Sequence, residues 1–129
     1  MIRAYRSTDE KPLGDWLEGA GVPRKDHAFA FGETWVLELD GKTSGFFTWR
    51  WDNMMPHLSH FFVAPEARGV DAARELVKAF CLRIKGLGRK TAIINTLACK
   101  PFLRKFVEYY FRRKPYAESN GHNFFLVEV

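Results

Sequence analysis

One stretch near the middle of the chain limits its fold more than any other: an apolar run that leads into an amphipathic segment. Residues 60–64 read His-Phe-Phe-Val-Ala and favour a β-strand that ends at Pro65. After Arg68 and Gly69, apolar residues recur every three or four positions over residues 73–87, which predicts a helix. Because the first turn of a helix carries unpaired backbone N–H groups and partial positive charge, this strand, loop and helix can form an anion site.

Apolar periodicity in the rest of the chain predicts an α/β protein whose central strands form an antiparallel meander. Asp40-Gly41 and Asn120-Gly121 each separate two strand-like runs, and such pairs favour tight hairpin turns. Ser7, followed by Glu10, predicts a capping box at the first helix. The strand–helix–strand order around the loop predicts a right-handed crossover with parallel pairing. The expected strands are 2–6, 34–39, 45–51, 58–63, 91–96, 114–118 and 123–129, and the expected helices are 7–20, 73–87 and 101–110.

Size and charge limit the class of protein. At 129 residues the chain is expected to form one domain, and 47% hydrophobic residues suffice for one core. The net charge of +5 suits an anionic ligand or an acidic partner, but it is spread along the chain. The one basic run, Arg112-Arg113-Lys114, is typical of a helix C-terminus, so nucleic acid is not an expected partner.

Cysteine usage and hydropathy indicate the compartment. Cys81 and Cys99 have no neighbours at metal-ligand spacing, so we expect reduced, buried thiols and no metal site. No apolar run approaches the length that spans a bilayer. The chain is therefore expected to lack a signal peptide or membrane anchor and to be cytoplasmic.

The sequence Val63-x-Pro65-Glu66-x-Arg68-Gly69, followed by small residues, resembles the acetyl-CoA signature of the GNAT superfamily of N-acetyltransferases. This resemblance implies one domain over residues 1–129, with a mixed, mostly antiparallel sheet and helices on both faces. It also implies that one strand holds the pantetheine arm of acetyl-CoA through backbone hydrogen bonds and that the loop holds the pyrophosphate. The implied residues are Phe61, Phe62 and Val63 for the arm, and Arg68, Gly69, Val70, Asp71, Ala72 and Ala73 for the pyrophosphate.

Asp71 departs from the family pattern, because it stands where the consensus Arg/Gln-x-x-Gly-x-Gly/Ala has its middle glycine. A carboxylate about 5 Å from a phosphate opposes binding by about 1–3 kcal/mol per charge, which would weaken the cofactor site without abolishing it. Alternatively, Asp71 is the N-cap of the helix, and its carboxylate occupies the N–H groups that a pyrophosphate needs. The sequence leaves both interpretations open.

The resemblance is weaker in the helix near the C-terminus, where Phe111 alone agrees with the family pattern. Family members carry a tyrosine here that protonates the departing thiolate, and this position is Phe106, which cannot donate a proton. Tyr109 or Tyr110 can take the acid role if the helix has a different register. The alternative is that both tyrosines are packing residues.

Two histidines on the strand before the loop are candidates for the base. The unperturbed pKa of histidine suits proton transfer near neutral pH. His57 and His60 are three residues apart, so on a regular strand they point to opposite faces, and at most one of them lines a cleft. His60 is the better candidate, and the alternative is a partly exposed histidine on a sheet. His122, near the closing hairpin turn, is expected at the surface.

The resemblance therefore implies an acetyl-CoA-dependent N-acetyltransferase that acts on an amine of a small molecule or a protein. The alternative is a GNAT-fold protein without catalysis that serves as an interaction or structural module, similar in size and motif loss to compact members in tailed bacteriophages. Asp71 and Phe106 favour this alternative, because each removes a family function at its expected position. The sequence leaves the acceptor, a homodimer and any protein partner open.

Overall fold

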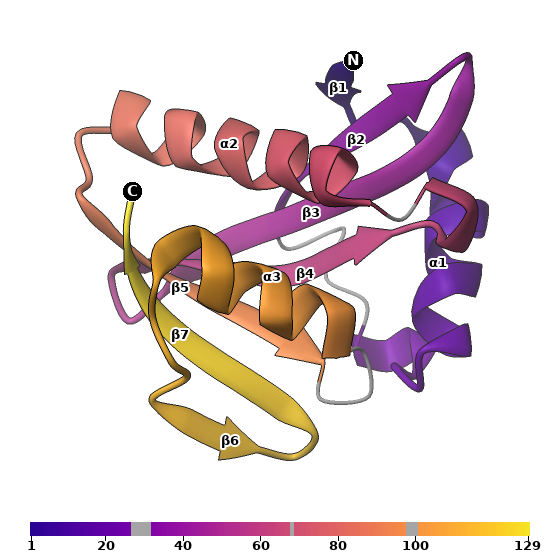
Figure 1. The fold of residues 1–129 in the computed structure, drawn as a ribbon. Helices are drawn as coiled ribbons and strands as arrows, with labels where there is room; N and C mark the ends of the chain where they lie inside the picture. The colour runs from indigo at the N-terminus through magenta and orange to yellow at the C-terminus, as the bar shows by residue number, and fades with distance from the viewer. Residues whose placement is uncertain (27–31, 68, 98–100) are drawn as a thin grey trace.

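The computed structural model describes residues 1–26, 32–67, 69–97 and 101–129, and these residues form one seven-stranded sheet with three α-helices (Figure 1). The strand order is β1-β2-β3-β4-β5-β7-β6, and every neighbouring pair is antiparallel except the parallel pair β4–β5. The strands are β1 Ile2–Ala4, β2 Glu33–Leu39, β3 Lys42–Asp52, β4 Met55–Val63, β5 Thr91–Leu97, β6 Ala117–Ser119 and β7 His122–Glu128. The helices are α1 Glu10–Gly19, α2 Val70–Gly86 and α3 Pro101–Phe111.

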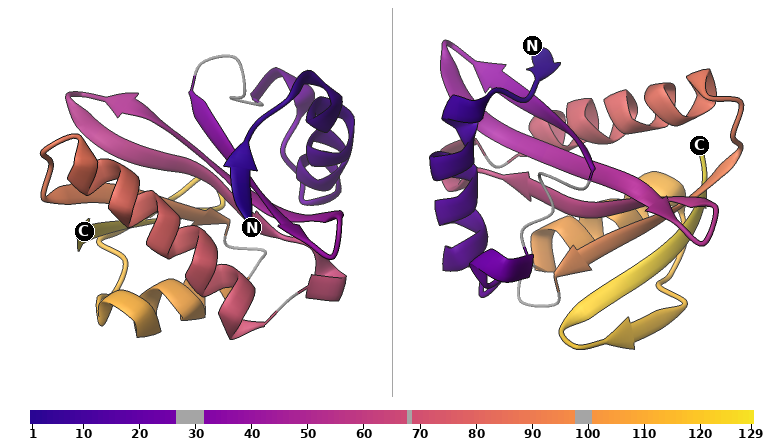
Figure 2. Two further views of the ribbon diagram at one scale, coloured as in Figure 1. Left: turned by 90° about the horizontal axis from the view of Figure 1, so that it is seen from above. Right: turned by 180° about the vertical axis from the view of Figure 1, so that it is seen from behind.

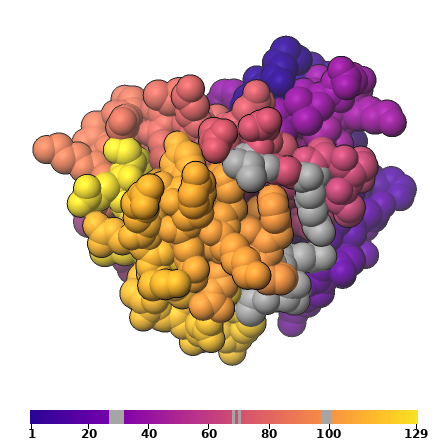
Figure 3. Space-filling model, in the orientation of Figure 1, coloured from indigo at the N-terminus to yellow at the C-terminus, as the bar shows by residue number. Residues whose placement is uncertain are grey.

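The sheet separates two layers of helix, as expected from the sequence. Helix α1 covers one face, and helices α2 and α3 cover the other (Figure 2). In the space-filling view, α2 and α3 form most of the front surface (Figure 3). None of the helices in the described part of the chain is long and apolar enough to cross a bilayer. The mixed, mostly antiparallel sheet and the crossover through α2 confirm the predicted fold class.

Alternating side chains of the central strands supply both layers of the core. Phe46 and Phe47 are fully buried on β3 and belong to opposite clusters, because successive strand residues point to opposite faces. On the α1 side, Trp16 stacks on Phe62 with ring centroids 5.2 Å apart. On the α2 side, Phe80 packs edge-on against Phe47 at 5.8 Å.

The capping box lies one residue earlier than predicted, at Arg6 and Asp9 and not at Ser7 and Glu10. A 3-10 turn, Ser7–Asp9, precedes the helix, and the Asp9 carboxylate accepts a hydrogen bond of 2.8 Å from the backbone N–H of Arg6. Asp9 is fixed there by Arg3, whose guanidinium donates to both of its oxygens at 2.8 Å. This pairing across 6 residues explains why Asp9, and not Glu10, takes the capping role.

The structure describes one of the two cysteines. Cys81 on α2 is a free, half-buried thiol, and burial raises its pKa to about 11. A thiol with this pKa is protonated and unreactive at neutral pH, in agreement with a reduced packing residue. Cys99 lies outside the described residues.

Candidate active site

Two parallel strands diverge at the centre of the sheet. The register of β4 and β5 covers two pairs, His57 with Ile93 and Leu58 with Ile94. Strand β4 continues to Val63, and β5 continues to Leu97, where its pairing is with β7 on its other side. Figure 1 shows the ends of the two strands pointing apart, with the end of β4 near the start of α2. A wedge between strands of one sheet exposes backbone edges that can bind an extended ligand.

The first turn of α2 lies just beyond this wedge, after the 3-10 turn Pro65–Ala67. Gly69 is the N-cap, in an extended conformation, and no side chain of the described residues forms a capping hydrogen bond to this helix. A Cβ at Gly69 would have nothing within 4 Å, so the space in front of this residue is open. Below the turn, the small side chains of Ala72 and Ala73 are buried.

Asp71 does not cap α2, so that interpretation of the sequence is wrong. Because Gly69 takes the N-cap position, Asp71 becomes the second helical residue, and its side chain is 99% exposed. Its ion-pair partner is Arg74, with Nη1 3.4 Å from Oδ1. The Asp71 carboxylate therefore leaves the amides of the first turn uncovered, although its charge stays near any anion bound there.

The remaining residues of the predicted cofactor site lie on β4, at the start of α2 and in the loop between them. The side chains of Phe61, Phe62 and Val63 are buried in the two core layers, so their contacts with a ligand at the wedge would come from the backbone. Val70 begins α2. Arg68 lies outside the described residues. The structure thus places the predicted strand and helix start next to each other, and the binding roles stay predictions.

Orphaned polar atoms at the end of β5 fit a ligand in the wedge. Thr96 and Asn123 are register partners on β5 and β7, and both are almost fully buried. The Thr96 hydroxyl and both polar atoms of the Asn123 amide have no hydrogen-bond partner among the described residues. Their strand positions place them on the face that carries α3, as for Ile94 and Phe125. Because buried polar groups are normally paired, these atoms are suited to a bound polar group.

On the other face of the sheet, a cavity of about 710 Å³ lies between the segment after α1, strands β3 to β5 and the β6–β7 hairpin. These elements surround the same region when the molecule is seen from behind (Figure 2). The cavity is rich in side chains that can exchange protons or form hydrogen bonds. Those from the sheet are Arg50, His57, Ser59, His60, Asn95, Ser119 and His122.

A β-bulge brings both histidines of β4 to this cavity. The register with β3 pairs Thr48 with His60 and Trp49 with Leu58, so Ser59 is the extra residue. An extra residue shifts the side-chain alternation by one, and His57, Ser59 and His60 therefore border the cavity together. The prediction that His57 and His60 point to opposite faces is wrong, because it assumed a regular strand.

His57 is the more deeply placed of these histidines, with 6% of its surface exposed. Its Nδ1 lies 3.3 Å from Oδ2 of Asp52, and its buried Nε2 has no partner among the described residues. The ring packs near Phe124, with centroids 6.1 Å apart. Burial lowers the pKa of His57, and the Asp52 carboxylate opposes this shift.

His122 also borders the cavity, which corrects the expectation of a simple surface residue. Its Nδ1 lies 2.8 Å from Oδ1 of Asn95, and its ring centroid is 6.2 Å from that of Phe124. Phe124 thus lies near both His57 and His122. No local sequence pattern indicates this arrangement, because the pairing of β5 with β7 joins residues 27 positions apart.

The two candidate tyrosines lie away from the histidines. Tyr109 is 66% exposed on α3, beside Arg112 and Lys114. Tyr110 packs against Phe111 with centroids 4.8 Å apart, and it borders a different cavity of about 380 Å³; burial raises its pKa. Neither tyrosine borders the cavity of His57 and His60. Their acid role remains a prediction that these positions do not support.

A mixed sheet with diverging parallel strands, a helix N-terminus at the wedge and a polar cavity on the opposite face define an acyltransferase domain. The chain belongs to the GNAT family: residues 28–113 match the family model described as acetyltransferase (GNAT) domain. Among curated proteins, none matches the chain.

Solved structures share the fold at low sequence identity. The ribosomal-protein-S18-alanine N-acetyltransferase from Escherichia coli is 16% identical, with a TM-score of 0.74 over 100% of this chain and 93% of that one. A GNAT family acetyltransferase from Elizabethkingia anophelis, with acetyl-CoA bound, is 15% identical, with a TM-score of 0.66 over 100% and 97%. A putative GNAT acetyltransferase from Desulfovibrio desulfuricans is 14% identical, with a TM-score of 0.76 over 100% and 97%.

Proposed function

We propose that this protein is an acetyl-CoA-dependent N-acetyltransferase whose acceptor amine binds in the cavity bordered by His57 and His60. The observation that carries this proposal is the uncovered first turn of α2, which lies at the wedge between β4 and β5. A family neighbour with acetyl-CoA bound supports the use of this co-substrate. The acceptor is a small molecule or a protein with an accessible amine.

The residues at the wedge suit the parts of acetyl-CoA. The amides that follow Gly69 bind the pyrophosphate, because a helix N-terminus stabilises negative charge. The open space at Gly69 and the small Ala72 and Ala73 let these phosphates approach the backbone. Backbone groups of residues 61–63 bind the pantetheine arm. Acetyl-CoA supplies an activated thioester, and the residues of this chain bind it, orient it and remove a proton from the acceptor.

The position of Phe106 does not exclude acetyl transfer. Phe106 lies on the buried face of α3 and cannot donate a proton. The leaving group is a thiolate, and a thiol has a pKa of about 8.5, so the thiolate departs readily and water can protonate it near neutral pH. A tyrosine acid would accelerate this step, but the reaction does not require one.

Calorimetric titration with acetyl-CoA tests the cofactor site. We expect micromolar binding, and Asp71→Asn should tighten it about fivefold, because one exposed charge near a phosphate opposes binding by about 1 kcal/mol in a high dielectric. Glu75→Gln is the matched control: Glu75 is exposed on the next turn of α2, and removing its charge should change the affinity less. No heat and no thermal shift at millimolar acetyl-CoA would overturn the proposal and favour the GNAT fold without catalysis.

A further inference from the structure

We propose that His57 and Asp52 form a dyad in which Nε2 of His57 is the general base that removes a proton from the acceptor amine. This inference rests on the proposed function, because it assigns a residue to the same reaction. It differs from the sequence-based choice of His60. The reasons are the hydrogen bond at Nδ1, the burial of the ring and the charge of its partner.

The hydrogen bond to Asp52 fixes the tautomer of His57. A carboxylate accepts hydrogen bonds, so at 3.3 Å the Nδ1 atom carries the proton and Nε2 keeps its lone pair. Nε2 is buried and has no partner within the described part of the chain. A buried acceptor without a partner costs free energy, and a ligand N–H in the cavity would relieve that cost.

The position of His57 suits proton removal next to the wedge. β4 and β5 form two register pairs, and His57 belongs to the first of them, directly before the strands diverge. The bulge at Ser59 turns this part of β4 toward the cavity. An amine bound at Nε2 is therefore close to the gap between the diverging strands. Through this gap the amine can reach a thioester that is bound in the wedge.

Among the groups around His57, the Asp52 carboxylate favours a base that becomes positive during the reaction, and Arg50 opposes it. His57 interacts with Asp52 and Arg50 on β3 and with His122 on β7, and His60 on β4 and Asp26 after α1 border the same cavity. The Asp52 carboxylate stabilises an imidazolium at His57. His122 is held by the neutral amide of Asn95, which gives no such stabilisation. This difference, together with the deeper burial of its ring, separates His57 from His122.

The proton balance of the step is complete. The acceptor ammonium gives one proton to Nε2 of His57, and the free amine nitrogen forms the C–N bond of the amide as the C–S bond of the thioester breaks. The second proton of that nitrogen goes to the thiolate, which leaves as the free thiol. His57 then returns its proton to the solvent. The products are the N-acetylated acceptor, CoA and one proton.

Nitrogen NMR of the histidine rings tests the dyad without an acceptor. In ¹⁵N-labelled protein we expect His57, assigned by loss of its signals in His57→Gln, to be protonated at Nδ1 and to titrate below the ordinary pKa of about 6.5. Asp52→Asn should lower this pKa further. Asp15→Asn, with 50% of its side chain exposed against 46% for Asp52, should not change it. A proton on Nε2, or no response to Asp52→Asn, would overturn the dyad.

Kinetics with the probe amines spermidine, tyramine and alaninamide test the role of the base. At saturating acetyl-CoA, His57→Gln should lower kcat/KM about 100-fold or more and remove the acid limb of its pH profile, with the Kd for acetyl-CoA unchanged. An acid limb that persists in His57→Gln and disappears in His60→Gln would overturn the assignment. If none of the probe amines reacts, the NMR tautomer and titration of His57 decide whether the dyad is present. If the unmodified protein does not bind acetyl-CoA, the proposed function is refuted, and this outcome is distinct from failure of the dyad.

Discussion

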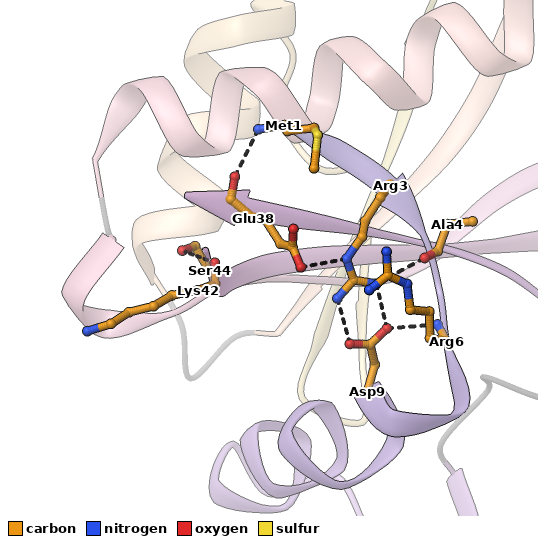
Figure 4. A network of polar contacts seen from close by, with 8 residues as sticks. All are labelled: Met1, Arg3, Ala4, Arg6, Asp9, Glu38, Lys42 and Ser44. Atoms are coloured by element: carbon orange, nitrogen blue, oxygen red, sulfur yellow. Dashed lines mark hydrogen bonds and ion pairs between the residues drawn. The ribbon is translucent and has the colours of Figure 1, made fainter. Parts of the chain in front are cut away.

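A single carboxylate, that of Asp9, joins three segments at one end of the sheet (Figure 4). It accepts from the backbone of Arg6 and from Arg3, which also donates to Glu38 on β2 at 2.8 Å. Hydrogen bonds from Arg3 hold the pKa of Asp9 below its usual range, against the opposing effect of burial. The carboxylate is therefore charged in the folded protein and fixes the short strand β1 to α1.

We expect Asp9→Asn to lower the free energy of unfolding by about 3 kcal/mol at pH 7, because it leaves the half-buried guanidinium of Arg3 without part of its counter-charge. Urea denaturation followed by circular dichroism measures this change. Asp15→Asn removes an exposed carboxylate and should cost less than about 1 kcal/mol. The difference between Asp9→Asn and the unmodified protein should shrink as the pH falls from about 4, the ordinary pKa of an unfolded aspartate, through the lower pKa of Asp9 in the folded protein, because the unfolded chain binds the proton first. An equal loss in both variants would contradict this role.

At the scale of elements, the site depends on how closely α2 approaches the sheet. Gly45 on β3 pairs with Val63 at the end of β4. A Cβ at this position would lie 2.8 Å from the carbonyl oxygen of Phe62 and 3.0 Å from Cδ1 of Leu76 on α2. Gly45 therefore allows the helix and the end of β4 to pack together where acetyl-CoA is proposed to bind.

Gly45→Ala should destabilise the protein by about 1–3 kcal/mol, because backbone at Phe62 cannot move aside as a side chain would. It should also weaken acetyl-CoA binding, since α2 is displaced. Thermal unfolding and calorimetric titration measure the two effects. Gly19→Ala is the matched control: it lies at the end of α1, where a Cβ meets nothing within 4 Å, and it should be neutral or slightly stabilising. Equal behaviour of the two variants would contradict the close-approach argument.

The sequence predicted the helices and strands better than it predicted where each begins or how β3 and β4 pair. The hairpin at Asp40-Gly41, the helix after Gly69 and the parallel crossover are all present. Strand β4 begins at Met55, three residues earlier than expected, because Asn53 and Met54 both adopt positive φ and close a tight turn. The bulge at Ser59 has no signature in the apolar pattern, since it depends on pairing with β3.

At the scale of the whole molecule, His57 and Asp9 make the free energy of unfolding depend on pH. Burial lowers the pKa of His57 in the folded protein, so the unfolded chain binds more protons between that value and about 6.5. Stability from His57 is present above pH 6.5 and is lost as the pH falls through the folded pKa. Asp9 adds a second loss at lower pH.

We therefore expect the free energy of unfolding to decrease from pH 7.5 to pH 5, and His57→Gln to flatten this part of the curve. The slope, and not the absolute stability, is the readout, because glutamine also changes the packing against Phe124. Urea titrations at half-unit pH steps give the slope. A slope that does not change in His57→Gln would show that His57 keeps its ordinary pKa in the folded protein.

The sequence by itself determined the order and type of the elements and the loop that resembles an acetyl-CoA signature. These features follow from local patterns of side chains, turn residues and helix breakers. Tertiary structure decided that Asp71 points to solvent, that both histidines of β4 share one cavity, and that Tyr109 and Tyr110 lie elsewhere. Register, bulges and helix phase set these outcomes, and they depend on partners distant in the chain, which local patterns do not contain.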